Sequence, residues 1–310
     1  MEINTIRHGD CLNEHEHIDN GSVDLILTDP PYGTIKNNPK NWTVGNKKDN
    51  EWDNAINPKK IYNIANRILR KNGRLILFSQ QPYTTELIEE QIPNLPHSYN
   101  LYWYKNDFAN GLLCNKAPVN YIEDIVVFKK DNPLNENEFI HPLREYFAKV
   151  MEYIGLSLKQ INDCLGHRKA EHSFYINSTQ FSLCTKETYQ ELIDKFNIGN
   201  MQGFKQYKKL KQIDKRHKER FKSIFNLPKG KKYKSNVLEY SKDYGGYHPT
   251  QKPVALLEDL IKTYTNEGDL VVDLTAGSGS TGVACQNTNR DYILIEQEEE
   301  YVDVIRDRLS

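Results

Sequence analysis

Residues 269–282 predict a strand, a glycine-rich turn and the start of a helix in direct succession. The apolar run Asp269–Asp273 is typical of a buried strand, and it is followed by Gly277, Gly279 and Gly282. Glycines let a ligand approach the backbone, and a helix start offers free amides and the positive end of a dipole. Only 28 residues follow Gly282 in the 310-residue chain, too few to complete a nucleotide-binding sheet. The remaining strands must therefore come from the N-terminal part of the chain.

A second strand near the end of the chain, Tyr292–Ile295, is followed by the acidic residue Glu296. A carboxylate at the tip of the strand next to a glycine-rich loop can accept hydrogen bonds from both hydroxyls of a ribose. The same pattern fits the fingerprint of nicotinamide dinucleotides, so a dehydrogenase is one alternative. The short C-terminal remainder favours a nucleoside cofactor without a pyrophosphate, for which S-adenosylmethionine is the main candidate.

In the N-terminal part, the apolar run Val23–Thr28 leads directly into the tetrapeptide Asp29–Tyr32. Open α/β sheets bind ligands at the carboxyl ends of their strands. Pro30 and Pro31 stiffen the loop and lack amide donors, which leaves carbonyl groups free to accept hydrogen bonds. A carboxylate, free carbonyls and an aromatic ring suit a planar molecule with an amino group, such as a base extruded from its stack. By itself, the tetrapeptide would also fit an ordinary turn.

Five blocks in order resemble the S-adenosylmethionine-dependent DNA amino-methyltransferases whose catalytic motif precedes the cofactor motif, the β group. The blocks are Gly9–Leu12, Asp29–Tyr32, His248–Pro253, Asp273–Thr281 and Glu296. They lie within residues 1–130 and 237–310, about two thirds of the chain. The resemblance implies an α/β fold with a doubly wound, mostly parallel sheet, Rossmann-like with permuted motif order. The chain departs from the family at Leu274 and Thr275, where the usual loop has Pro-Phe.

The resemblance also implies functions for individual residues. The expected catalytic motif consists of Asp29, Pro30, Pro31 and Tyr32. The residues expected to bind the cofactor are Asp10, Cys11, Asp29, His248, Thr250, Lys252, Asp273, Thr275, Gly277, Ser278, Gly279, Thr281 and Glu296. Asp rather than Ser at position 29 indicates N6 of adenine as the methylated atom. N4 of cytosine is the alternative, because its exocyclic amine requires the same chemistry.

The expected reaction is methyl transfer to an amine that is a poor nucleophile, because its lone pair is delocalised into the base. Asp29 and the carbonyl of Pro30 would accept the amine protons and favour the tetrahedral nitrogen of the transition state. Tyr32 would stack on the flipped base. The sulfonium is already an activated donor, so no cysteine nucleophile is needed, and we expect no metal site.

The organisation of the chain predicts three segments. Residues 1–130 form the catalytic half of the methyltransferase domain, and residues 237–310 form its cofactor-binding half. Between them, residues 131–236 are expected to be a helical, basic insert for target recognition. This order follows from the motif positions and from the change in composition between the two halves.

Within the first segment, strand-like and helix-like pieces alternate, which indicates a doubly wound sheet. Residues 61–69 have helical spacing, and we expect Asn72 and Gly73 to end that helix. The strands expected to follow are Arg74–Phe78, Asn100–Tyr104 and Asp124–Phe128.

The net charge of −1 conceals a strong asymmetry along the chain. Between Met201 and Lys234 there are 13 Lys or Arg residues against two acidic ones, which gives this segment +11 and the remainder −12. A basic block of this kind is typical of a surface that contacts phosphates, although a solvated helix face is the alternative. The candidate phosphate contacts are Lys205, Lys208, Lys209, Lys215, Arg216 and Lys222.

The insert contains a possible helix–turn–helix. Ser157 and Gln160 form a capping box at the start of its first helix, and Gly166 ends that helix. A second helix beginning at about His167 would enter the major groove and present Arg168, Lys169 and His172 to the bases. Thr185 then caps another helix. A plain helical insert and a catalytically inert DNA-binding protein both remain alternatives.

The five cysteines are odd in number and scattered, which favours a reducing cytoplasm over a disulfide framework. The sequence has neither a long apolar span nor a signal pattern. The expected partner is double-stranded DNA. The sequence leaves open the recognised site, an association with a restriction endonuclease and homodimer formation.

Overall fold

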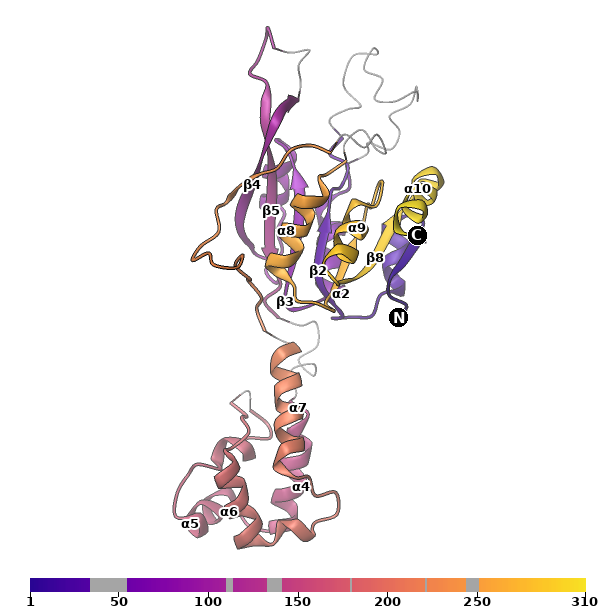
Figure 1. Ribbon diagram of the computed structural model, residues 1–310. Coiled ribbons are helices and arrows are strands. Elements are labelled where there is room, and N and C mark those ends of the chain that lie inside the picture. The colour runs from indigo at the N-terminus through magenta and orange to yellow at the C-terminus, as the bar shows by residue number, and fades with distance from the viewer. Residues whose placement is uncertain (34–54, 110–113, 133–140, 179, 221, 244–250) are drawn as a thin grey trace. The chain divides into compact units, whose positions relative to one another are not determined.

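The computed structural model describes residues 1–33, 55–109, 114–132, 141–178, 180–220, 222–243 and 251–310. It divides into two compact units (Figure 1). The larger unit combines Met1–Asn132 with Ser223–Ser310, and the smaller unit is Pro133–Lys222. Among the described residues, no helix is long and apolar enough to cross a membrane.

The larger unit contains an eight-stranded sheet of order β1-β8-β7-β2-β3-β5-β4-β6. Among these strands, only β5 runs antiparallel to its neighbours. The strands are β1 (Thr5–His8), β2 (Val23–Thr28), β3 (Leu69–Ser79), β4 (His97–Ala109), β5 (Asn120–Lys129), β6 (Val237–Glu239), β7 (Leu270–Asp273) and β8 (Asp291–Glu296). Because β1 pairs with β8 and β2 pairs with β7, both ends of the chain build one sheet. The predicted doubly wound, mostly parallel sheet is confirmed.

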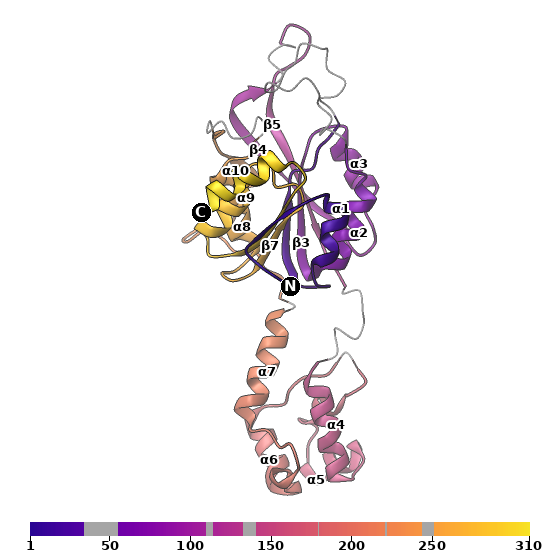
Figure 2. The same cartoon turned by 90° about the vertical axis from the view of Figure 1, so that its right-hand side faces the viewer.

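Helices cover both faces of this sheet (Figure 2). On one face lie α1 (Cys11–Glu14), η1 (His15–His17), α2 (Pro58–Ile68) and α3 (Tyr83–Glu89), and on the other lie α8 (Val254–Tyr264), α9 (Ser280–Asn287) and α10 (Glu299–Leu309). In β2, Ile26 packs into the first layer, whereas Leu25 and Leu27 pack into the second. A strand buried on both faces has a continuous apolar run, which is why Val23–Thr28 lacks polar alternation.

The helix α2 ends earlier than the sequence predicted. Asn57 caps its start and Pro58 occupies its first turn, but the helix stops at Ile68 rather than at Asn72 and Gly73. The chain enters β3 at Leu69, which pairs with Val23. The register then shifts before β2 and β3 continue, and Asn72 adopts a left-handed φ of 62° in the shifted stretch. Sheet pairing therefore overrides the local helical spacing.

The smaller unit is helical and has its own hydrophobic core. Its elements are α4 (Leu143–Ile154), α5 (Leu158–Leu165), η4 (Glu171–Phe174), α6 (Lys186–Phe196), η5 (Ile198–Asn200) and α7 (Tyr207–Arg220). The side chains at the centre of this core include Phe147, Ile161, Tyr189 and Leu210, which are fully buried or nearly so. Each major helix thus contributes a residue to one common core.

Ser157 and Gln160 make the predicted capping box, and Gly166 ends α5 with a left-handed φ of 76°. The predicted second helix of a helix–turn–helix is wrong. Residues 167–170 form turns, and only the four-residue 3-10 helix η4 follows. Burial of Ala170 and Phe174 in the core holds this segment in a tight turn, which leaves no α-helix to enter a groove.

Residues 223–236 were expected to belong to the insert, but they are part of the larger unit. The amide of Asn226 donates to the carbonyl of Thr263 at 2.7 Å. The side-chain amide of Asn226 donates to the carbonyl of Thr265 at 2.9 Å. These bonds attach the segment to the end of α8, so the basic block of the sequence is divided between the two units.

Candidate active site

The two predicted motifs meet at the carboxyl edge of the sheet. Asp29 follows β2, Asp273 ends the neighbouring β7, and Glu296 ends β8. The hydroxyl of Thr275 donates to the carbonyl oxygen of Asp29 at 3.0 Å and lies 2.8 Å from the hydroxyl of Thr28. Thr275 stands where the family that the sequence resembles has Phe, and its hydroxyl joins the glycine-rich loop directly to the loop of the Asp29–Tyr32 motif.

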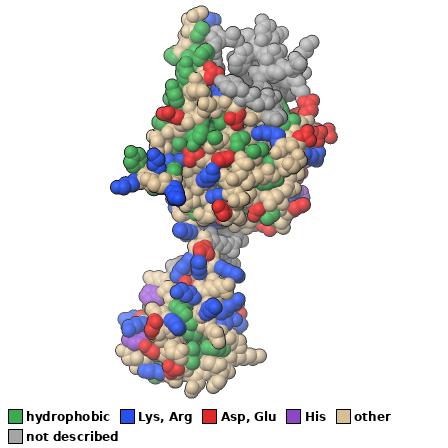
Figure 3. Space-filling model, viewed as in Figure 1, with side chains coloured by type: hydrophobic (Ala, Val, Ile, Leu, Met, Phe, Trp, Pro, Cys, Tyr) green, Lys and Arg blue, Asp and Glu red, His purple; other side chains and the backbone are tan. Residues whose placement is uncertain are grey.

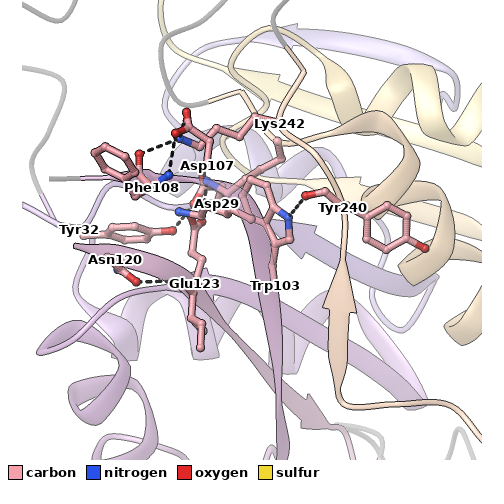
Figure 4. Close-up of polar contacts among 12 residues, drawn as sticks. Asp29, Tyr32, Trp103, Asp107, Phe108, Asn120, Glu123, Tyr240 and Lys242 are labelled. Carbon is pink, nitrogen blue, oxygen red and sulfur yellow. Dashed lines mark hydrogen bonds and ion pairs between the residues drawn. The ribbon is translucent and has the colours of Figure 1, made fainter. Parts of the chain in front are cut away.

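Both carboxylate oxygens of Asp29 have partners. The hydroxyl of Tyr32 donates to Oδ1, and the ammonium of Lys252 donates to Oδ2. Burial raises the pKa of the Asp29 carboxyl; the Lys252 ammonium opposes this effect and the Glu123 carboxylate adds to it. Because the Asp29 side chain is still 24% exposed, a ligand can reach it. Asp29 and Tyr32 lie together beside Glu123 (Figure 4).

The ring of Tyr32 lies at the wall of this site. It packs against Tyr83 of α3 with 5.8 Å between the ring centroids and an interplanar angle of 34°. Burial and the neighbouring Asp29 raise the pKa of the Tyr32 hydroxyl well above its usual value, which keeps the hydroxyl protonated and able to donate. Tyr32 therefore holds Oδ1 of Asp29 through a neutral hydrogen bond.

Lys252 also contacts a second acid. Its Nζ lies 2.9 Å from Oε1 of Glu123, and Oε2 of Glu123 lies 2.7 Å from Nζ of Lys105. The side chains of Lys105, Glu123 and Lys252 are 4%, 5% and 9% exposed. Sequence reasoning assigned Lys252 to the cofactor and missed Lys105 and Glu123 altogether. Both strands carry other charged residues as well, Asp107 in β4 and Asp124 in β5, so the sequence alone does not single out Lys105 and Glu123.

The glycine-rich loop is held by the two acids at its strand ends. The hydroxyl of Thr281 donates to Asp273 at 2.5 Å, and the amide of Thr275 donates to the same carboxylate at 3.1 Å. Burial raises the pKa of Asp273 to about 6. The amide of Gly277 donates to Glu296 at 2.7 Å. Asp273 and Glu296 therefore hold the loop's shape in addition to any contact with a ligand.

Glycine is needed at two positions of this loop for different structural reasons. Gly279 has a φ of 78°, and an added Cβ would lie 2.9 Å from Ile305 of α10. Gly277 has a φ of 53°, but an added Cβ would meet nothing within 4 Å. Gly279 thus permits close packing beneath the loop, whereas the backbone at Gly277 borders open space. The adjacent Ser278 is 4% exposed, and its carbonyl accepts from Arg308 at 2.5 Å.

The N-terminal block lies at the same edge because β1 is the neighbour of β8. The amide of Gly9 donates to the carbonyl of Glu296 at 2.9 Å. Oδ1 of Asp10 accepts from the amide of Leu12 at 2.9 Å and caps α1. Burial and the nearby Asp10 raise the pKa of the Cys11 thiol to about 12, so Cys11 stays neutral. The predicted cofactor residues His248 and Thr250 lie outside the described residues.

The predicted DNA-contacting residues all lie in the smaller unit. Arg168 makes a bidentate pair with Glu171 at 2.7 Å, and Nδ1 of His172 lies 3.1 Å from the carbonyl oxygen of Gln180. Lys169 is exposed in the turn between them. With the second helix absent, these three residues do not form the recognition face that the sequence predicted.

The helix α7 and its flanks carry the other candidates (Figure 3). Lys205 is partly buried, and its Nζ lies 5.6 Å from the centre of the Tyr146 ring. The exposed candidates are Lys208, Lys209, Lys215, Arg216 and Lys222. Leu210 and Asp214 of the same helix are buried. One side of α7 therefore packs on the core, and the rest presents positive charge to solvent.

The known proteins that this chain resembles are DNA methyltransferases. The sequence profile of the N6_N4_Mtase family, described as DNA methylase, matches residues 23–307. Type II methyltransferase M2.MboI of Moraxella bovis is 26% identical over 98% of this chain and 86% of its own length. DNA adenine methyltransferase YhdJ of Escherichia coli strain K12 is 24% identical over all of this chain and 83% of its own.

Among solved structures, the M1.HpyAVI–SAM complex has a TM-score of 0.54 and 19% identity, and the match covers 99% of this chain and 98% of that one. The two folds are therefore similar along nearly the whole length of this chain. The profile match covers both motifs and nearly the whole sheet. The chain belongs to the N6/N4 DNA methylase family, and its activity is the S-adenosylmethionine-dependent methylation of DNA that the motif order predicted.

Proposed function

We propose that this DNA methylase acts on N6 of an adenine flipped out of duplex DNA, with Asp29 as the acceptor for the amine. The observation that supports this most strongly is the bond from Thr275 to the Asp29 carbonyl, because it joins the loop of the proposed acceptor to the glycine-rich loop. Acceptor and donor sites thus share one edge of the sheet. Methyl transfer requires this proximity, since the two reacting atoms must approach in line.

The cofactor residues fit a nucleoside with a charged amino-acid tail. The loop backbone borders open space at Gly277, and the carboxylate of Glu296 lies at its edge. Asp10 and Glu296 would hold the nucleoside, and the loop at Gly277–Gly279 with the start of α9 would hold the tail. When bound, S-adenosylmethionine supplies an electrophilic methyl group on a sulfonium.

The residues of the catalytic loop accept and orient the amine. Asp29 and the carbonyl of Pro30 would accept its two N–H groups, which shifts electron density onto the nitrogen as it becomes tetrahedral. The proton released after transfer passes to Asp29 or to water. Pro31 keeps the loop rigid, and the ring of Tyr32 would stack on the base.

The choice of adenine rests on Asp at position 29 and on YhdJ, a relative named as a DNA adenine methyltransferase. The exposed basic residues of α7 would contact DNA phosphates and position the target. The Type II designation of M2.MboI supports a role beside a restriction endonuclease with the same recognition site. The oligomeric form expected in that role is a monomer or a homodimer.

The test is to incubate the purified protein with tritiated S-adenosylmethionine and unmethylated genomic DNA, then to digest the DNA and separate the nucleosides. We expect label in N6-methyl-2′-deoxyadenosine, and sequencing with modified-base detection gives the recognised site. Label in N4-methyl-2′-deoxycytidine would overturn the assignment of adenine. An Asp29→Ala preparation run in parallel reveals any contaminating methylase.

A further inference from the structure

We propose that Lys252 is a positioning residue for the acceptor carboxylate rather than a ligand of the cofactor. Its buried ammonium joins Asp29 to Glu123 and holds Asp29 in the charged form that accepts the amine. This inference rests on the proposed function, because it assumes that Asp29 is the acceptor. It assigns a purpose to Glu123 and Lys105, which neither the motifs nor the family comparison singles out.

The first reason is geometric. The ammonium of Lys252 has carboxylate partners on two sides, Oδ2 of Asp29 and Oε1 of Glu123, the latter at 2.9 Å. Its third side faces the ring of Phe78, whose centroid lies 5.1 Å from Nζ. These three neighbours surround the ammonium of Lys252, and its side chain is only 9% exposed. Little of its ammonium is left for a cofactor carboxylate.

The second reason is charge balance. The buried chain Lys105–Glu123–Lys252–Asp29 alternates in sign, so each carboxylate has a neighbouring ammonium. Removing Lys252 alone would leave Asp29 and Glu123 as two buried acids with only Lys105 to balance them. Like charges in such a site favour protonation of one acid. A protonated Asp29 would donate to the amine nitrogen or lose one acceptor position, and both effects oppose transfer.

Other groups around Asp29 do not supply this positive charge. Tyr32 donates a neutral hydrogen bond, and Tyr83 packs on Tyr32. Asp273 at the end of β7 is acidic and 4% exposed. Lys105 acts through Glu123, which it contacts at 2.7 Å. Among the described residues at this site, Lys252 is therefore the ammonium that contacts Asp29 directly.

The pKa directions agree with this geometry. Burial acts to raise the pKa of Glu123, but Lys252 and Lys105 outweigh it and lower the pKa. Burial acts to lower the pKa of Lys252, but Asp29 and Glu123 outweigh it and raise the pKa. The pKa of Asp29 is raised by burial, with Lys252 opposing. Lys252 is thus the main group that opposes protonation of Asp29.

The experiment measures single-turnover methylation from pH 5 to pH 9 and, separately, the Kd of S-adenosylmethionine by calorimetry without DNA. For Lys252→Met, we expect the acidic limb of the rate profile to move upward by at least about one pH unit, since a nearby ammonium lowers a carboxyl pKa by roughly one to three units. The Kd of the cofactor should stay within about threefold of the wild-type value. Lys252→Arg retains the charge, so its acidic limb should stay near the wild-type position even where its maximal rate falls.

A second variant gives the opposite shift. Glu123→Gln removes the neighbouring negative charge, so that Asp29 becomes the one carboxylate paired with Lys252. The acidic limb of the rate profile should therefore move to lower pH. It also covers the case in which Lys252→Met fails to fold. Lys234→Met is the matched control, because Lys234 forms a similar buried ion pair elsewhere in the larger unit. Its Nζ lies 2.5 Å from Oδ2 of Asp259. We expect its rate profile to have the wild-type pH dependence.

Two results would overturn the inference. One is a rise of tenfold or more in the cofactor Kd of Lys252→Met with an unmoved acidic limb, which would make Lys252 a cofactor ligand. The other is an unmoved limb in both Lys252→Met and Glu123→Gln with cofactor binding intact. Asp29→Asn distinguishes these two results from failure of the proposed function. Methyl transfer by that variant would mean that Asp29 is not the acceptor.

Discussion

The charged groups at the candidate active site of the larger unit and those on α7 of the smaller unit are held in opposite ways. In the larger unit, Lys105, Glu123 and Lys252 are each less than a tenth exposed and paired in a chain. In the smaller unit, the side chains of Lys215 and Lys218 on α7 are 74% and 63% exposed. Buried charges are fixed and act strongly at short range, whereas exposed charges are screened and adapt to a polyanion. We therefore expect the buried chain at Asp29 to serve the chemistry and the exposed charges of α7 to contact DNA.

The largest expected effect comes from Asp29→Ala, which tests the chemical side of this contrast. Removing the acceptor should slow methyl transfer by at least about 100-fold, the usual loss when one preorganised polar partner of a transition state is deleted. The Kd of S-adenosylmethionine should change little although Asp29 is among the residues expected to bind it, because most of the others, Asp273 and Glu296 among them, lie at the ends of other strands. The measurement is single-turnover label transfer beside calorimetry. A rate within tenfold of wild type would refute the assignment of Asp29.

The next effect concerns the basic surface. Replacing Lys208, Lys209 and Arg216 together with Gln should weaken DNA binding and flatten its salt dependence. Each phosphate contact contributes about 0.9 to the slope of log K against log salt, so the slope should fall by up to about 2.7. Fluorescence anisotropy with a labelled duplex at several salt concentrations measures this slope, while the cofactor Kd should be unchanged.

The matched control removes the same number of charges from exposed positions of the larger unit. Lys59, Lys262 and Arg306 lie on α2, α8 and α10, and their side chains are 64%, 54% and 61% exposed. Their replacement with Gln should leave the salt slope close to that of the wild-type protein. Equal losses in both triple variants would mean that net charge, rather than the α7 surface, governs DNA affinity.

A pH effect of intermediate size is expected from Asp273. Its folded-state pKa is raised to about 6 from 3.8, so its contribution to stability is complete below pH 3.8 and is lost as the pH rises through about 6. The difference corresponds to about 3 kcal/mol. Asp273→Asn, which stays neutral, should lack this loss. Urea unfolding of both proteins between pH 4 and pH 7.5 tests it, and parallel stability curves would contradict it.

The smallest expected effect comes from Thr275, the residue that joins the two loops. Thr275→Val removes the hydroxyl contacts to Thr28 and to the Asp29 carbonyl, which should lower stability by about 1–2 kcal/mol and reduce the transfer rate. Thr275→Ser retains the hydroxyl and should stay closer to wild type in both. Thermal unfolding with single-turnover rates measures the two effects. Identical behaviour of the Val and Ser variants would show that the hydroxyl has no part in joining the loops.

Several local features could be predicted from the sequence because their causes are local. In the run Val23–Thr28, the apolar residues Val23 and Leu25–Leu27 pack into the two helical layers, and such a short apolar run is typical of a buried strand. The capping box at Ser157 and the end of α5 at Gly166 depend on neighbouring residues only.

The errors have non-local causes. Residues after His167 carry no strong helix breaker, yet the packing of Ala170 and Phe174 into the core holds them in turns. The end of α2 was misplaced because Leu69 pairs with Val23 across the sheet. The segment around Asn226 looked like part of a basic insert, but its hydrogen bonds go to Thr263 and Thr265 in the larger unit.

The sequence by itself determined the family, the sheet and the two loops, because motif identity and the periodicity of apolar residues are written in consecutive positions. Only the tertiary structure decided what Lys252 touches. Glu123, Lys105 and Asp29 come from three separate strands or loops, and a charge far along the chain becomes a neighbour only after the sheet has formed. Electrostatic contacts depend on distance in space, and the order of residues does not encode that distance directly.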